Sequence, residues 1–311
     1  MQKGVLGVVC GMAISGAINC LILSFASRHD IAFSLLPLEI KKLLRYGLPL
    51  IFTNIAGILM NLSDRFFIKY YTGLGEVGIY NLGYQIGSVI LVVLVSPFKL
   101  IWPATLLSVR HDKDAGEFYS RVMTYFVYAG LFLSLAVGVF ATKIVELVGT
   151  REYLEAYRVI FIISLSYLLI GMSDVMHVGI SIKRKTEYSM LIVSSAALVN
   201  LILNFLLVPP WGMMGAAMAT ILATIFMVYI KQIVVKKIYY IKYEWNRIFT
   251  MAAVAVGLYW TISMLGTEDI WYEIPLKLVF VTLFPVILYL SGFYQKIEVE
   301  TLRSFVKKLF L

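Results

Sequence analysis

The feature that most constrains the fold is a series of long apolar runs that repeat along the chain. A helix needs about 20 consecutive apolar residues to span a membrane, and about nine runs approach or exceed that length. They cover residues 4–26, 44–70, 77–106, 118–141, 155–180, 187–208, 213–235, 248–265 and 274–293. The predicted fold class is therefore an all-α polytopic membrane protein with about nine transmembrane helices.

The composition supports the same class. Of the 311 residues, 60% are hydrophobic and 14% are charged, and the mean hydropathy is +0.86. Soluble domains carry about 25% charged residues, so a buried soluble core does not explain the runs. Membrane proteins concentrate basic residues in their cytoplasmic loops. The net charge of +9 is therefore interpreted as topological, and no nucleic-acid partner is predicted.

The loops between the runs alternate in their content of basic residues. The connections after the first, third, fifth, seventh and ninth runs are the richer set. They contain Arg28, Lys41, Lys42, Arg45, Arg110, Lys113, Arg121, Lys183, Arg184, Lys185, Lys236, Lys237, Lys242, Arg247, Lys296, Arg303, Lys307 and Lys308. The connections at residues 209–211 and 267–273 contain no basic residue. The connection between the fourth and fifth runs fits the alternation least well, because it brings Lys143, Arg151 and Arg158, diluted by three glutamates. The positive-inside rule therefore places the richer set and the C-terminus in the cytoplasm.

A polar stripe interrupts the second run. Five residues at helical spacing form it: Asn54, Gly57, Asn61, Asp64 and Arg65. A charge inside the bilayer costs about 3 kcal/mol or more, so such residues usually face a bundle interior or a wet cavity. Adjacent residues on a helix point about 100° apart. Asp64 and Arg65 are therefore expected to have separate partners rather than to pair with each other.

A second polar stripe lies on the next run. A break at residues 72–75 contains two glycines, and the helix after it is expected to begin near Val77. That helix carries Asn81, Gln85 and Ser88 on one face. Two neighbouring helices with polar stripes favour a solute pathway, which a membrane anchor or scaffold would not need.

The sequence contains no motif of an enzyme or a metal site. His29, His111 and His177 are isolated, and there is no His-Glu-x-x-His motif, phosphate-binding loop or Gly-x-Ser-x-Gly motif. Cys10 and Cys20 lie in the first run without metal-ligand spacing, and they are interpreted as buried thiols. No catalytic residue, metal or cofactor is therefore predicted, and the chain is not expected to be an enzyme.

Asp174 and His177 interrupt the end of the fifth run. They are three residues apart, so their side chains can pair on one helix face. A structural pair is the favoured interpretation, and a role in proton or ion coupling is the alternative.

Three stretches carry a more specific pattern. The first joins LRYGLP at residues 44–49 to NLSDRF at 61–66, and the second joins GEVGIYNLGY at 75–84 to Trp102-Pro103. The third joins KRKT at 183–186, NLILNF at 200–205 and PWGMMGAAMAT at 210–220. In this order the stretches resemble the polysaccharide, or lipid-linked oligosaccharide, flippases of the multidrug/oligosaccharidyl-lipid/polysaccharide exporter superfamily, which include the O-antigen flippases. The resemblance covers nearly the whole chain but only the later part of the family pattern.

The resemblance implies two six-helix lobes that face a central cavity, often followed by two further helices. Residues 1–30 would be the last helix of the first lobe and 31–240 the second lobe. Residues 241–311 would then be two additional helices and a basic cytoplasmic tail. The lobes would rock about the cavity in alternating access. Five helices at the front of the family pattern are absent, so a missing N-terminal lobe or glycan-assembly proteins are expected as partners.

The cargo implied by the resemblance is an undecaprenyl-pyrophosphate-linked oligosaccharide. It would cross the bacterial cytoplasmic (inner) membrane, from inner to outer leaflet, in polysaccharide, O-antigen or lipopolysaccharide biosynthesis for the cell envelope. A pyrophosphate and a sugar need basic and hydrogen-bonding side chains. The predicted substrate pathway comprises Asn54, Asn61, Asp64, Arg65, Asn81, Tyr84 and Gln85. Arg45 and Lys99 are candidates for substrate contact, although an interfacial anchor is favoured for both.

Three alternatives stay open from the sequence. A drug or cation antiporter of the same superfamily would need acidic residues deep in the lobes, and Asp64 and Asp174 are the two that qualify. A membrane enzyme of glycan assembly, such as a ligase or polymerase, should show a large outer loop. The longest outer loop expected here, residues 142–154, is short, about a dozen residues, which argues against an enzyme. A non-transporting component of glycan assembly would not need the two polar stripes.

Overall fold

The computed structural model describes residues 4–28, 37–183, 185–265 and 270–294. All regular elements in these ranges are helices, which confirms the predicted all-α class. The α-helices are α1 (Gly4–Ala26), α2 (Pro37–Tyr71), α3 (Leu74–Gly87), α4 (Ser96–Ser108), α5 (Ala115–Val139), α6 (Ala141–Val148), α7 (Tyr157–Val175), α8 (Val178–Lys183), α9 (Thr186–Ile238), α10 (Trp245–Leu265) and α11 (Ile270–Leu290). A π-helix at Leu91–Val95 and a 3₁₀-helix at Arg151–Ala156 complete the order.

The described chain has the helices of a multi-pass membrane protein. Eight helical segments are long and apolar enough to cross a membrane. One of them, α9, has 53 residues and contains a non-helical residue, Gly212, at which it folds back. Counting its two arms separately gives the nine crossings expected from the apolar runs.

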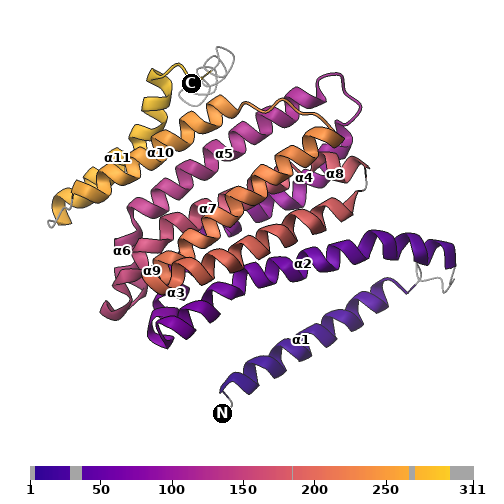
Figure 1. Cartoon of the computed structure of the whole chain (residues 1–311), viewed down its shortest axis with the longest axis horizontal. Coiled ribbons are helices and arrows are strands. Elements are labelled where there is room, and N and C mark those ends of the chain that lie inside the picture. Colours follow the sequence, from indigo (N-terminus) through magenta and orange to yellow (C-terminus); the bar gives the residue numbers. More distant parts are fainter. Residues whose placement is uncertain (1–3, 29–36, 184, 266–269, 295–311) are drawn as a thin grey trace. The chain divides into compact units, whose positions relative to one another are not determined.

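The sequence at residues 209–213 explains the turn inside α9. Pro209 and Pro210 have no N–H to continue a helix, and Gly212 has φ 51° and ψ −132°, which other residues rarely adopt. The carboxylate of Glu76, in the first turn of α3, accepts the N–H of Met213 at 2.7 Å. Glu76 thereby satisfies a backbone donor at the start of the second arm. Figure 1 shows the two arms of α9 lying side by side.

The chain divides into two units, residues 1–45 and 46–311, and the division falls inside α2. In the first unit apolar residues lie on all sides of α1, and its described side chains are exposed. Cys10 and Cys20 are therefore exposed in this chain, and the expectation of buried thiols is wrong. The predicted division at residues 30 and 240 follows the family plan and stays a prediction.

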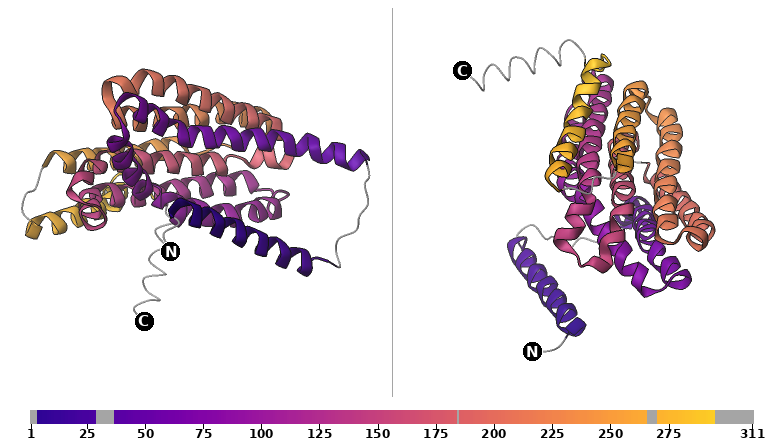
Figure 2. Two further views of the ribbon diagram at one scale, coloured as in Figure 1. Left: turned by 90° about the horizontal axis from the view of Figure 1, so that it is seen from below. Right: turned by 90° about the vertical axis from the view of Figure 1, so that its left-hand side faces the viewer.

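Helix α7 lies at the centre of the second unit, where α3, α5 and α9 pack against it. Helix α10 packs against α5, and α11 packs against both of them; these helices run alongside one another in Figure 2. Glycines bring α3 close to α7. A Cβ at Gly83 would lie 2.8 Å from the carbonyl oxygen of Ala156, and a Cβ at Gly87 would lie 2.9 Å from the Ile163 side chain. This close approach places the ring of Tyr84 against that of Tyr167, with centroids 5.7 Å apart.

Several helix boundaries differ from the apolar runs. Helix α3 begins at Leu74 rather than near Val77, because Gly73 turns the chain with φ 99° directly before it. The run at residues 77–106 is not one α-helix, since a π-helical segment separates α3 from α4. The fifth run is divided where Asp174 and His177 interrupt its apolar sequence: α7 ends at Val175 and α8 begins at Val178. His29 and the basic tail from residue 295 lie outside the described residues.

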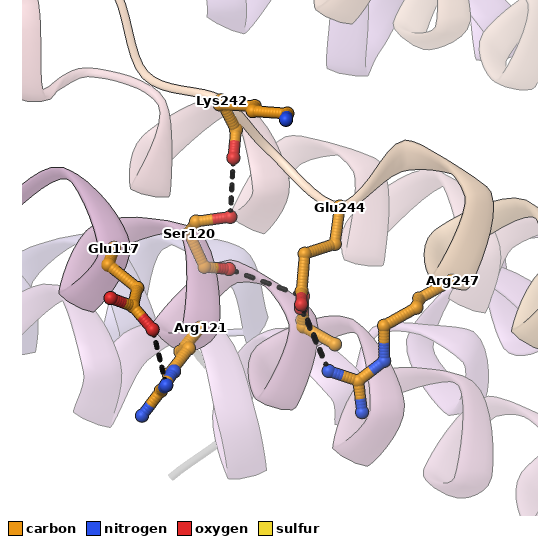
Figure 3. Close-up of polar contacts among 7 residues, drawn as sticks. Glu117, Ser120, Arg121, Lys242, Glu244 and Arg247 are labelled. Atoms are coloured by element: carbon orange, nitrogen blue, oxygen red, sulfur yellow. Dashed lines mark hydrogen bonds and ion pairs between the residues drawn. The ribbon is translucent and has the colours of Figure 1, made fainter. Parts of the chain in front are cut away.

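The connection between α9 and α10 is fastened to α5 (Figure 3). Ser120 Oγ donates to the carbonyl of Lys242 at 2.8 Å, and Thr124 Oγ1 donates to Glu244 Oε2 at 2.6 Å. The same Glu244 oxygen accepts from Arg247 Nη1 at 2.9 Å. These contacts fix the end of the second arm of α9 relative to α5, and hence relative to α7.

Candidate functional site

A polar cavity of about 360 Å³ lies inside the second unit, among α2, α3, α7 and α9. Apolar side chains form part of its wall. Twelve polar residues complete it: Thr53, Asn54, Asn61, Tyr84, Ser166, Tyr167, Ser173, Asp174, His177, Ser189, Thr220 and Lys231. A polar cavity among membrane-spanning helices is the kind of site at which a polar solute can be held away from lipid.

Helical periodicity explains how these side chains reach one cavity. On α2 the lining residues Asn54, Gly57 and Asn61 are three and four positions apart, so they share a face. On α9 the lining residues Thr220, Met227 and Lys231 are spaced by seven and four. The lining residues of α7 and the turn after it, Ile163, Tyr167, Ile170, Asp174 and His177, follow the same rule.

Asp64 lies directly behind the cavity wall and is fully buried. Its Oδ2 accepts hydrogen bonds from Tyr80 Oη at 2.6 Å and from Thr220 Oγ1 at 2.8 Å. Its Oδ1 accepts from Asn204 Nδ2 at 2.8 Å. Three donors from α3 and α9 therefore offset the loss of hydration of this carboxylate. Because Thr220 also lines the cavity, it connects the cavity wall to Asp64.

The network around Asp64 extends along α9. Asn200 Oδ1 accepts from Ser63 Oγ at 2.8 Å and from Asn204 Nδ2 at 3.1 Å. Carboxylate, amide and hydroxyl oxygens are the ligand types that hard cations take, and Asp64, Asn200, Asn204 and Thr220 bring such groups together. Within the described residues, no group of three or more His, Cys, Asp and Glu side chains is placed to hold a metal ion.

Arg65 has partners that differ from those of Asp64, as the helical geometry predicted. Its Nε donates to Asn81 Oδ1 at 2.6 Å, and its Nη1 donates to the carbonyl of Asn61. The guanidinium carbon lies 4.5 Å from the centroid of the Tyr84 ring, a cation–π distance. The Tyr84 hydroxyl in turn donates to Asn61 Oδ1 at 2.5 Å. Arg65 therefore holds two cavity-lining residues in place without lining the cavity itself.

A second cluster of charged side chains, from α4, α7 and α9, lies near the α7–α8 junction. Lys231 Nζ donates to Ser173 Oγ at 2.8 Å, and its side chain is buried although it lines the cavity. Lys99 Nζ, from α4, lies 2.9 Å from Asp174 Oδ2. The expected pairing of the Asp174 and His177 side chains is not what the structure shows. The carboxylate of Asp174 pairs with Lys99, and the backbone N–H of His177 donates to the Asp174 carbonyl at 3.1 Å in the turn that ends α7.

The structure brings together part of the predicted site. Asn54, Asn61, Tyr84, Asp174 and His177 line the cavity, and Asp64, Arg65 and Asn81 support it from behind. Lys99 reaches the cavity wall through Asp174. Gln85 is exposed and is not among the lining residues. Arg45 is exposed and belongs to the first unit.

Sequence reasoning missed several residues of the site. Lys231 could have been predicted from the sequence as a site residue, because it is a lone charge after 18 uncharged residues in the run that begins at residue 213. Ser173, Tyr167 and Thr220 carried none, because serine, tyrosine and threonine are common in membrane helices and only the packing of α7 on α9 brings them to the cavity.

Comparisons with known proteins agree with this fold. Residues 3–105 match a family described as polysaccharide biosynthesis protein. Over 248 residues the chain is 23% identical to the uncharacterized membrane protein MJ1068 of Methanocaldococcus jannaschii. The aligned region covers 77% of this chain and 47% of MJ1068. The chain thus spans about half the length of this curated relative.

The fold is similar to that of a solved structure of the lipid II flippase MurJ in an inward closed conformation. The TM-score is 0.67 at 15% identity, and the match covers 94% of this chain and 64% of the MurJ chain. At that identity the likeness concerns the fold. The family match over residues 3–105 and the MurJ-like fold both agree with the flippase resemblance that the sequence motifs carry.

Proposed function

We propose that this chain forms part of the pathway by which a lipid-linked oligosaccharide crosses a membrane by alternating access. The observation that carries the proposal is the polar cavity inside a bundle of apolar helices. A lipid-linked sugar has a large polar head that must avoid hydrocarbon, and Asn54, Asn61 and Tyr84 offer it hydrogen bonds and an aromatic face. The MurJ-like fold and the polysaccharide biosynthesis family match support the same class of cargo.

The finer proposal is an undecaprenyl-pyrophosphate-linked oligosaccharide of polysaccharide or O-antigen biosynthesis, moved across a bacterial cytoplasmic membrane without covalent change. A first lobe would supply the opposite wall of the pathway. That lobe would come from another part of the same polypeptide or from a partner subunit. The family plan of two facing lobes motivates this partner, and the chain's 64% coverage of the MurJ structure is consistent with it.

A drug or cation antiporter fits the same cavity less well. Such a protein would need a carboxylate that the solute can reach. Asp64 is fully buried and saturated by three hydrogen-bond donors, and Asp174 is paired with Lys99. The other polar residues of the cavity lining carry amide, hydroxyl, aromatic and basic groups, which suit a sugar and an anion.

The proposal is tested by deleting the gene for this chain in its native cell and restoring it from a plasmid. Total lipid-linked oligosaccharide is measured by extraction, and the outward-facing fraction by a lectin that cannot cross the membrane. The expected result is an unchanged total and a lower outward-facing fraction, both restored by the plasmid. An unchanged outward-facing fraction contradicts the proposal, and a lower total indicates a role in synthesis instead.

A further inference from the structure

The cavity contains a buried cation whose charge the described chain does not balance. Lys231 is 5% exposed, and the ion pairs among the described residues include none with it. Its Nζ donates to Ser173 Oγ, a neutral partner, at 2.8 Å. Burying an ammonium group without an anion is costly. An anion that enters the cavity would therefore be stabilised at this position.

The nearby charges leave a net positive balance. Asp174 is the carboxylate that acts on Lys231, but it already pairs with Lys99 at 2.9 Å. One carboxylate thus stands against two lysines. This part of the cavity wall therefore has a net positive charge, which attracts an anion.

An unpartnered hydroxyl points to a ligand independently of the charges. Ser189 is 4% exposed, lines the same cavity, and its Oγ has no hydrogen-bond partner in the structure. A buried polar atom without a partner is destabilising, because it has lost its hydrogen bonds to water and gained none in exchange. A ligand oxygen would satisfy Ser189, and a phosphate presents several oxygens at once.

We infer that Lys231, Ser173 and Ser189 form an anion subsite that takes the phosphate or pyrophosphate of the lipid-linked cargo, with Asp174 as its internal competitor. The inference rests on the proposed function for the source of that phosphate. The uncharged wall formed by Asn54, Asn61 and Tyr84 is left for the sugar. Arg65 and Lys99, which the sequence offered as candidates for contact with the cargo, instead hold Asn81 and Asp174.

The subsite is tested by binding of inorganic pyrophosphate to the purified full chain in nanodiscs, measured by calorimetry. Lys231→Met should weaken binding by at least about tenfold, because a charge-assisted hydrogen bond contributes roughly 1.5–3 kcal/mol. Lys231→Arg should retain most of the affinity, since the charge is kept. Lys236→Met is the matched control, because Lys236 is an exposed lysine of the same helix that does not line the cavity.

Asp174→Asn separates the subsite from a merely structural role of the cluster. Removing the competing carboxylate should tighten pyrophosphate binding by several-fold, whereas a structural defect would weaken it. No binding to the wild-type chain, or equal binding to wild type and Lys231→Met, overturns the inference. Both readouts use a soluble anion and no transport. Failure of the gene-deletion test would therefore leave the anion site standing, and failure here would leave the transport proposal standing.

A further arm identifies the source of the phosphate. Undecaprenyl pyrophosphate should compete with inorganic pyrophosphate, whereas phosphatidylglycerol added to the nanodiscs should not. Equal competition by phosphatidylglycerol would assign the site to bilayer lipid headgroups and contradict its assignment to the cargo.

Discussion

At the scale of the residue, the buried carboxylate of Asp64 is the group that depends most on its hydrogen bonds. It sits inside the second unit with donors from Tyr80, Asn204 and Thr220, and no solvent reaches it. Its hydrogen-bond partners are residues 16 to 156 positions away in the sequence. Asp64 therefore joins α2 to α3 and to both arms of α9 through one side chain.

Replacing this carboxylate should destabilise the fold. Asp64→Ala leaves three buried donors without an acceptor, and we expect a loss of at least about 3 kcal/mol in unfolding free energy. The measurement is denaturant unfolding in detergent micelles, followed by tryptophan fluorescence. Asp112→Ala, at an exposed loop carboxylate, is the control and should change stability little. Equal stability of Asp64→Ala and wild type would show that the network does not form.

Arg65 was placed in the substrate pathway from the sequence, either touching the cargo or tying its helix to neighbours, and its contacts argue for the second role. It holds Asn81 by a hydrogen bond and lies over the ring of Tyr84. Arg65→Ala should therefore lower the amount of folded protein, with export reduced in the same proportion. The measurement is glycan export per molecule of membrane-inserted protein. Normal accumulation with a tenfold lower rate per molecule would return Arg65 to the substrate pathway.

At the scale of the element, the hairpin within α9 depends on one pair of residues. Gly212 adopts a positive φ, and a Cβ there would collide with the carboxylate of Glu76, which caps the second arm. Gly212→Ala should therefore cost on the order of 1–3 kcal/mol. Combining it with Glu76→Ala should cost less than the sum of the single changes, because the collision is removed. Strictly additive unfolding energies would show that the collision is not the cause.

The hairpin also predicts where its ends lie. Reporter fusions at Lys185 and at Lys237 should read cytoplasmic, because both residues belong to connections rich in basic residues. A fusion at Pro210 should read external. The structure of α9 predicts the same arrangement, with Lys185 and Lys237 at one end and Pro210 at the other. Its two arms lie side by side and are joined at Gly212. A reading on one side for both Lys185 and Pro210 would contradict two crossings within α9.

The elements differ in how far sequence could predict them. Apolar runs are local, so the crossings and the interruption near Asp174 were predictable. The π-helical segment at Leu91–Val95 was not, because its residues are as apolar as those of an α-helix. In the site, Asn54 and Asn61 followed from helical spacing on one helix. The bond between Asn204 and Asp64 joins residues 140 positions apart, and no periodicity predicts such a contact.

At the scale of the whole molecule, our proposal is that the described chain provides one wall of a pathway. The cavity lies inside the second unit, with its polar wall drawn from four helices that apolar residues otherwise dominate. Rocking of a lobe can expose such a cavity to either side of the membrane without unfolding any helix. The central claim is that the head group of a lipid-linked oligosaccharide occupies this cavity during transport.

Substituted cysteines test that claim most directly. Asn54→Cys reports on the cavity, because Asn54 is an exposed lining residue, and Gln85→Cys is the control, because Gln85 is exposed outside the lining. Both are made in a chain whose native Cys10 and Cys20 are replaced by serine. A hydrophilic thiol reagent then labels each variant with and without lipid-linked oligosaccharide. We expect slower labelling at residue 54 and unchanged labelling at residue 85 when the oligosaccharide is present. Equal labelling of residue 54 with and without it would contradict the account.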